Sequence, residues 1–159
     1  MDSSNSAFMM VCAALVFFMT PGLAFFYAGF DRKNNVIDLI LQNMLAIGVS
    51  TIMWVSVGYS LCFSGDVFGI IGNLDMAFLR GIETTTLFPD TKIPLYVFVC
   101  YQMMFAIITP ALMTGAFTRR MTTGAYIIFI TLWQLFVYYP FVHMVWGGGL
   151  LAQMGVLDF

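Results

Sequence analysis

A proline–glycine pair, Pro21-Gly22, lies inside an apolar run of this chain that is long enough to cross a lipid bilayer. In water, a proline in a helix interior is costly because it removes a hydrogen bond and clashes with the preceding turn. Membrane helices tolerate proline where neighbouring groups satisfy the freed backbone. The run, MTPGLAFFYAGF over residues 19–30, therefore predicts a membrane helix.

The composition indicates that most of the chain is solvated by lipid. Hydrophobic residues make up 61% of it, charged residues 9%, and the mean hydropathy is +0.93. In soluble domains about a quarter of the residues are charged. The net charge of -2 comes without any basic block, so neither a nucleic acid nor an anionic membrane surface is predicted as a partner.

Four apolar runs are long enough to span a bilayer as helices, which needs about 20 residues each. They cover about residues 7–29, 36–63, 95–117 and 125–142. The second and third are separated by a polar, slightly acidic loop. The predicted fold class is all-α, a polytopic membrane helix bundle in which residues 1–159 form the N-terminal portion of one membrane domain.

The basic residues predict the orientation. Arg32 and Lys33 lie between the first two spans, and Arg119 and Arg120 lie between the last two, so four of the six basic residues share one side. Short loops rich in Lys and Arg stay cytoplasmic. We therefore expect the N-terminus outside, a first span that is not a cleaved signal peptide, and a multi-pass protein of the plasma or inner membrane.

Side chains that could act in catalysis or bind a metal are scarce in this chain. No Ser/His/Asp, Cys/His or phosphate-cradling arrangement is present, so an enzyme is not predicted and no cofactor is expected. The three cysteines match no metal-ligand spacing and are interpreted as packing residues. Asp38 is interpreted as a solvated interfacial carboxylate, and the single histidine, His143, as a hydrogen-bonded structural imidazole rather than a proton relay.

Aromatic residues offer a more specific signal. Tyr101 and Phe105 are four residues apart on the third span, so one helix face presents both rings, and Trp146 follows the fourth span on the outer side. Such rings attract a small cation by about 0.5 to 2 kcal/mol per contact. The same residues also suit an ordinary interfacial aromatic belt. Spacing alone leaves both interpretations open.

Three motifs resemble those of the ammonium transporter family, Amt/Mep/Rh. FFMTPGLAFFY at residues 17–27, with NNV at 34–36, is similar to the family's first-helix signature, and YQMMFAIITPAL at 101–112 resembles its third helix. HMVWGGGLL at 143–151, followed by LDF at 157–159, resembles the segment that closes the outer vestibule. The motifs occur in the family's order and extend over nearly the whole chain.

The resemblance implies a role for five residues. Trp146 matches the tryptophan of an outer ammonium site, Phe105 the phenylalanine that walls this site and gates the pore, and Tyr101 a third ring where the family usually has phenylalanine. Asp158 matches a buried aspartate that supports the site through hydrogen bonds. Phe26 is expected near the cytoplasmic end of the conduction path.

The resemblance also implies a homotrimer with one pore per subunit, ammonium or ammonia as substrate, and a cytoplasmic regulatory protein as a further partner. The family's pore histidines lie on later helices and are absent from these residues, so we expect the chain to be a fragment of a longer transporter. Arg119 stands where the family commonly has glutamate. An ammonium-sensing membrane domain of a signalling protein is the alternative function.

Overall fold

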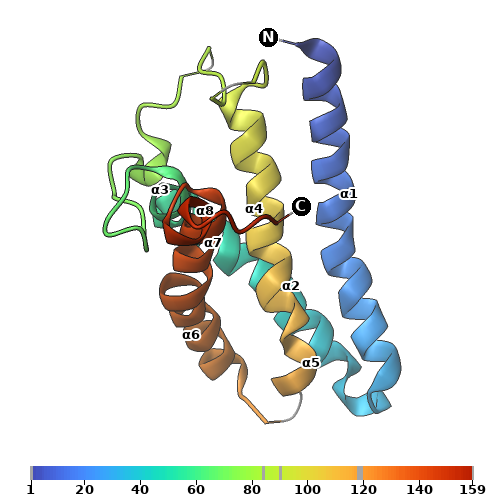
Figure 1. The fold of residues 1–159 in the computed structure, drawn as a ribbon. Coiled ribbons are helices and arrows are strands. Elements are labelled where there is room, and N and C mark those ends of the chain that lie inside the picture. Colours follow the sequence, from blue (N-terminus) through green and yellow to red (C-terminus); the bar gives the residue numbers. More distant parts are fainter. Residues whose placement is uncertain (1, 84, 90, 118–119, 159) are drawn as a thin grey trace.

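The computed structural model describes residues 2–83, 85–89, 91–117 and 120–158. Four long helical segments run alternately up and down beside one another (Figure 1). The first is α1 (Ser3–Phe30), and the second joins η1 (Lys33–Asn35), α2 (Val36–Met53), η2 (Trp54–Gly58) and α3 (Tyr59–Phe63). The third joins α4 (Leu95–Leu112) and α5 (Thr114–Phe117), and the fourth joins α6 (Thr123–Trp133), η4 (Gln134–Tyr138) and α7 (Tyr139–Trp146). Two short elements, η3 (Ala77–Leu79) and α8 (Leu150–Gln153), lie in the connecting and terminal segments. The all-α membrane fold class is confirmed.

The first helix begins beside the long loop that precedes α4. The Asp2 side chain caps α1 by accepting hydrogen bonds from the backbone N–H groups of Ser4 and Asn5, as is usual for an acidic N-cap residue. The Asp2 backbone N–H donates to the Lys92 carbonyl at 3.0 Å. The N-terminus therefore lies at the same end of the bundle as the long loop, opposite the connection that carries Arg32. Which end faces the cytoplasm stays a prediction, and Arg119 lies outside the described residues.

The fourth helical segment is longer than predicted. It was expected to end at Val142 with Pro140 near its end, but it begins at Thr123 and continues through Pro140 to Trp146. Directly before the proline, η4 forms a wider π-helical turn. Such turns re-route the backbone hydrogen bonds that a proline would break. The helix therefore does not stop at Pro140, and its true end carries Trp146.

A second π-helical turn, η2, lies in the middle of the second segment. Its last residue, Gly58, packs directly against a fully buried ring of the fourth segment: a Cβ built at Gly58 would be 2.7 Å from Cζ of Tyr139. Only glycine leaves room for this ring. Gly58 of η2 thus packs against Tyr139, the first residue after η4, where the second and fourth segments cross.

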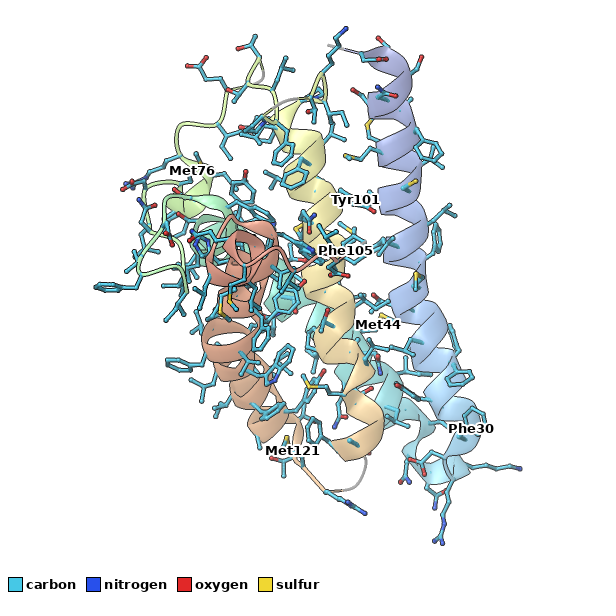
Figure 2. All side chains as sticks on the ribbon, in the orientation of Figure 1. Phe30, Met44, Met76, Tyr101, Phe105 and Met121 are labelled. Atoms are coloured by element: carbon cyan, nitrogen blue, oxygen red, sulfur yellow. The ribbon has the colours of Figure 1, made fainter. Side chains whose placement is uncertain are left out.

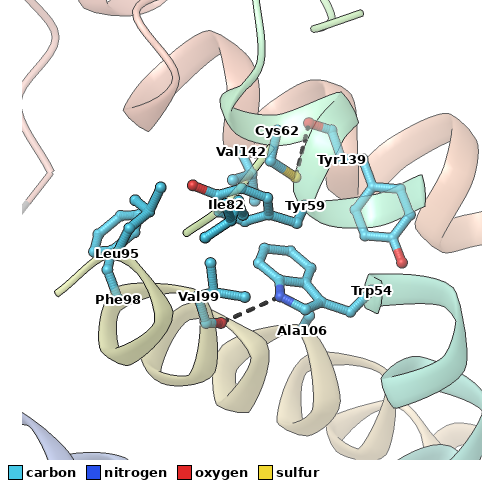
Figure 3. Packing of buried hydrophobic residues seen from close by; sticks show 10 residues of the cluster. All are labelled: Trp54, Tyr59, Cys62, Ile82, Leu95, Phe98, Val99, Ala106, Tyr139 and Val142. Atoms are coloured by element: carbon cyan, nitrogen blue, oxygen red, sulfur yellow. Dashed lines mark hydrogen bonds between the residues drawn. The ribbon is translucent and has the colours of Figure 1, made fainter. Parts of the chain in front are cut away.

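The larger apolar cluster packs the second, third and fourth helical segments against one another (Figure 3). The Trp54 indole is 1% exposed, and its Nε1–H donates to the Val99 carbonyl on α4 at 3.2 Å. Other rings surround this indole, with ring centroids 6.0 Å away at Tyr59 and 6.1 Å away at Tyr139. A smaller cluster of Ala46, Ala111, Tyr126 and Ile130 packs α2, α4 and α6 together further along.

Buried polar side chains join the helices at two levels. Gln134 donates from Nε2 to the Ser50 hydroxyl and to the Ala106 carbonyl, both at 2.8 Å, so it links three helical segments. Asn43 donates from Nδ2 to Thr114 Oγ1 at 3.0 Å. Interhelical hydrogen bonds of this kind hold membrane helices together, because lipid tails leave little hydrophobic drive for helix association.

Candidate functional site: the outer end of α4 and α7

Tyr101 and Phe105 form a ring pair on α4. Their centroids are 5.1 Å apart and their planes meet at 77°, an edge-to-face arrangement that is favourable for aromatic rings. Figure 2 shows the two residues one turn apart on this helix. Tyr101 also lines a cavity of about 200 Å³ with Ile93 and four residues of α1: Asn5, Phe8, Met9 and Cys12. The ring pair therefore faces the first helix near its outer half.

Trp146 ends α7, and its side chain is 41% exposed. It lines two cavities. One, of about 190 Å³, lies toward the C-terminal segment and is also lined by Tyr138, Phe141, Val142, Val145 and Asp158. The other, of about 310 Å³, lies under the long loop and includes Tyr59, Phe63 and Phe88. The Trp146 side chain therefore borders two cavities in the part of the chain that the structure describes.

Asp158 shares a cavity with Trp146, but its carboxylate is exposed rather than buried. The burial that the resemblance implied for this aspartate is therefore absent here. The cavity of Trp146 and Asp158 and the cavity of Tyr101 have no lining residue in common. The structure thus pairs Trp146 with Asp158, and Tyr101 with Phe105, without bringing the two pairs into one cavity.

Phe26 lies at the opposite end of the bundle, close to the basic connection between α1 and α2. It is 58% exposed, and its ring contacts that of Phe30 edge-on with centroids 4.9 Å apart. Both line a cavity of about 400 Å³ with Asp31 and Leu112. The position agrees with the end of the bundle at which the resemblance placed Phe26, whereas its role in conduction stays a prediction.

The buried imidazole of His143 is hydrogen-bonded to the partly exposed Asp66, a contact that the sequence analysis did not find. The imidazole is fully buried, and its Nε2 lies 3.1 Å from Oδ1 of Asp66 while its Nδ1 lies 3.0 Å from the Cys62 carbonyl oxygen. Oδ1 of Asp66 also accepts the Gly69 backbone N–H at 2.8 Å. The interpretation of His143 as a hydrogen-bonded structural imidazole is consistent with these contacts. No sequence signal joins the two residues, which are 77 positions apart.

The turn after Trp146 is shaped by close backbone contact. A Cβ built at Gly147 would collide with the Cys62 carbonyl oxygen and lie 2.7 Å from Nδ1 of His143. The backbone N–H of Leu150 donates to the Gly69 carbonyl at 2.7 Å. The glycine run therefore lets the outer end of α7 dock against α3 and the loop that follows it.

The part of the chain that the structure describes holds no group of three or more His, Cys, Asp or Glu side chains able to bind a metal ion. Asp38 is exposed in the first turn of α2, in agreement with its interpretation as a solvated carboxylate. The polar and aromatic groups around Trp146 are therefore aromatic rings, the Asp158 carboxylate and the His143–Asp66 pair.

Four helices long and apolar enough to cross a membrane, with aromatic residues gathered at the outer ends of α4 and α7, define a polytopic membrane protein. The model of the Ammonium Transporter Family matches residues 7–159. The chain belongs to the ammonium transporter family, and it is a multi-pass protein of the cell membrane.

Individual relatives agree with this assignment. An ammonium transporter of Aquifex aeolicus is 44% identical over 160 residues, which cover 100% of this chain and 38% of that protein. The crystal structure of Candida albicans Mep2 superposes with a TM-score of 0.88 at 33% identity, covering 100% of this chain and 35% of that one. A structure described as a sensor Amt protein superposes with a TM-score of 0.81 at 29% identity, over 90% of this chain and 34% of that one. The chain thus spans well under half the length of the relatives it matches.

Proposed function

We propose that the protein moves ammonium or ammonia across the cell membrane. The observation that carries this proposal is the family match over residues 7–159, together with relatives that are themselves named ammonium transporters. The chain spans 38% of the Aquifex relative. The proposal therefore concerns the protein at its natural length, with a pore that this half-bundle forms together with further helices.

At the outer end, ammonium is bound against the faces of Trp146, Phe105 and Tyr101. A bare cation is expensive in an apolar passage, whereas aromatic faces attract it. Release of one proton from ammonium to the water outside then leaves neutral ammonia, which crosses an apolar pore far more cheaply than the cation does. The Trp146 side chain is 41% exposed, and Tyr101 and Phe105 contact each other edge-to-face. The cavities of Trp146 and Tyr101 are separate here, so the proposal requires the three rings to face a common site in the assembled pore. In the same proposal Phe105 also gates the pore.

Two further residues have supporting roles. Asp158 shares the cavity of Trp146 and supplies a carboxylate beside the cation. It is exposed in this chain, so its support of the site by hydrogen bonding depends on burial by other parts of the protein. Phe26 lines the cavity at the far end of the bundle, where the pore opens to the cytoplasm.

Replacing Trp146 with leucine tests the outer site. Loss of a cation–π contact costs about 0.5 to 2 kcal/mol, which corresponds to a roughly two- to thirtyfold rise in the KM for methylammonium. The selectivity for methylammonium over sodium is expected to fall as well. The measurement is uptake into liposomes, with Phe18→Leu on α1 as the control, because Phe18 is 70% exposed and lines neither Trp146 cavity. Unchanged affinity and selectivity in Trp146→Leu would contradict the outer-site assignment.

The assembly is proposed on family grounds alone: a homotrimer, with one pore in each subunit and a cytoplasmic regulatory protein as partner. Native mass spectrometry of the detergent-extracted protein measures the subunit number directly. A monomer or dimer would rule out the trimer.

An ammonium-sensing membrane domain is the second candidate, favoured by the likeness to the sensor Amt structure. In that case the same vestibule binds ammonium, but the output is a signal rather than transport. Liposome uptake separates the two candidates: saturable uptake supports transport, and ammonium binding without uptake supports sensing.

A further inference from the structure

The contacts of His143 require more protons than a neutral imidazole and an ionised carboxylate supply. The Cys62 carbonyl can only accept a hydrogen bond, so Nδ1 of His143, 3.0 Å away, must carry a proton. Nε2 faces a carboxylate oxygen at 3.1 Å, so a second proton must lie between His143 and Asp66. Because Oδ1 of Asp66 also accepts the Gly69 N–H at 2.8 Å, the arrangement is that of an imidazolium bonded to a carboxylate.

This pair holds the segment that carries Trp146. His143 lies three residues before Trp146 on α7, and its own carbonyl accepts the backbone N–H groups of Gly147 and Gly149. Asp66 lies in the loop after α3, and Gly69 in the same loop accepts the Leu150 N–H. The outer end of α7 is thus tied to α3 and to this loop on both sides of Trp146.

The other titratable groups near the His143 imidazole contact different partners or point away from the ring. From α3, the Cys62 thiol contacts the Tyr139 carbonyl, and on α7 itself the Tyr139 hydroxyl lies against Gly58. In the loop, Asp75 is bonded by the Asn73 side chain, and Asp158 lies in the cavity on the Trp146 surface. Asp66 is the carboxylate in contact with the ring.

We propose that His143 and Asp66 share a proton that fixes the outer end of α7 and so positions Trp146 for ammonium. The proposal rests on the proposed function of Trp146. When the pH rises and the shared proton leaves, the neutral imidazole keeps one N–H for two acceptors, so either the Asp66 carboxylate or the Cys62 carbonyl faces an unprotonated ring nitrogen. That contact then becomes repulsive, α7 is tied less tightly to α3 and its loop, and Trp146 is held less firmly. The pair is a positioning device that holds Trp146 more firmly while the shared proton is present.

The substitution Asp66→Asn distinguishes this mechanism from a purely structural role. Asparagine has nearly the same shape, and its amide N–H can donate to Nε2 of a neutral imidazole while Nδ1–H still donates to Cys62. The variant therefore keeps the contact without the extra proton. Asp66 is 46% exposed, so the substitution places no unpaired group in the core. Asp75→Asn, in the same loop but without contact to the imidazole, is the matched control.

The experiment measures methylammonium uptake by the natural-length protein in liposomes across the titration range of imidazole, with thermal stability measured in parallel. The proportion of methylammonium to methylamine changes with pH, but at any one pH it is the same for every variant. The variants are therefore compared with one another at each pH. We expect KM to rise several-fold with pH in the wild type and in Asp75→Asn, at constant kcat, and melting temperature to fall over the same range. In Asp66→Asn both dependences are lost.

Each alternative result would overturn one particular part of the proposal. Wild-type stability that does not change with pH, or that changes equally in Asp66→Asn, would overturn the shared proton. A stability change that is lost in Asp66→Asn while KM follows pH equally in both proteins would overturn the link to Trp146. Unaltered affinity in Trp146→Leu would instead refute the proposed function, and the stability measurement would still decide whether the proton is shared.

Discussion

At Gly147 a single hydrogen atom in place of a side chain decides how α7 ends. The Cα of this residue lies so close to α3 that a Cβ would collide with the Cys62 carbonyl oxygen and press on the His143 ring. The Cys62 carbonyl oxygen cannot move aside without lengthening its 3.0 Å hydrogen bond to Nδ1 of His143. The contact therefore accounts for a glycine directly after Trp146, in a run that the sequence alone shows only as a break in the apolar pattern.

We predict that Gly147→Ala destabilises the protein by about 1 to 3 kcal/mol, the usual cost of overpacking a close contact. Gly124→Ala on α6 is the control, since a Cβ there meets no atom within 4 Å and alanine is the better helix former. Unfolding in mixed detergent–SDS micelles measures both free energies. Equal stability of the two variants would show that α7 does not approach α3 this closely.

At the scale of elements, Gln134 joins three helical segments through one amide group. Its Nε2 donates to Ser50 on α2 and to Ala106 on α4, whereas its Oε1 is buried without a partner among the described residues. Gln134 lies in η4, the π-helical turn just before Pro140. The widened turn and the amide thus occur at the same level of the bundle.

For Gln134→Leu we expect a loss of about 1 kcal/mol in the free energy of unfolding. Interhelical hydrogen bonds in membranes average about 0.6 kcal/mol each, and leucine also removes the unpartnered Oε1, which offsets part of the loss. Thr131→Val is the control, because the Thr131 hydroxyl bonds only within its own helix, to Ile127. The same SDS titration applies, and a loss as large in Thr131→Val as in Gln134→Leu would argue against the interhelical role.

At the scale of the whole molecule, four spans place the N-terminus and the long loop at one end and the basic connections at the other. The charge asymmetry assigns the basic end to the cytoplasm. Figure 1 shows the alternation of the helices but contains no membrane, so the sidedness depends on this rule alone.

An epitope tag before Asp2 and another between Arg120 and Met121 test the sidedness. We expect the N-terminal tag to be stained on intact cells and the tag after Arg120 only after permeabilisation, because Arg32, Lys33 and Arg120 lie on the retained side. A tag inserted between Asp31 and Arg32 is the internal control and should behave like the one after Arg120. Staining of the N-terminal tag and the Arg120 tag from the same side would contradict the predicted topology.

Composition and apolar run length alone were enough to predict the membrane class, the number of spans and most of their bounds, because a helix in lipid must be long, apolar and self-bonded. The helical spacing of Tyr101 and Phe105 likewise predicted their ring contact. Local patterns could not place the end of the fourth span, since the π-helical turn that carries the helix past Pro140 is stabilised by packing against α2 and α4. Nor could they pair His143 with Asp66 or show that Asp158 is exposed here. Those features depend on contacts between residues far apart in the chain, and only the folded bundle brings such residues together.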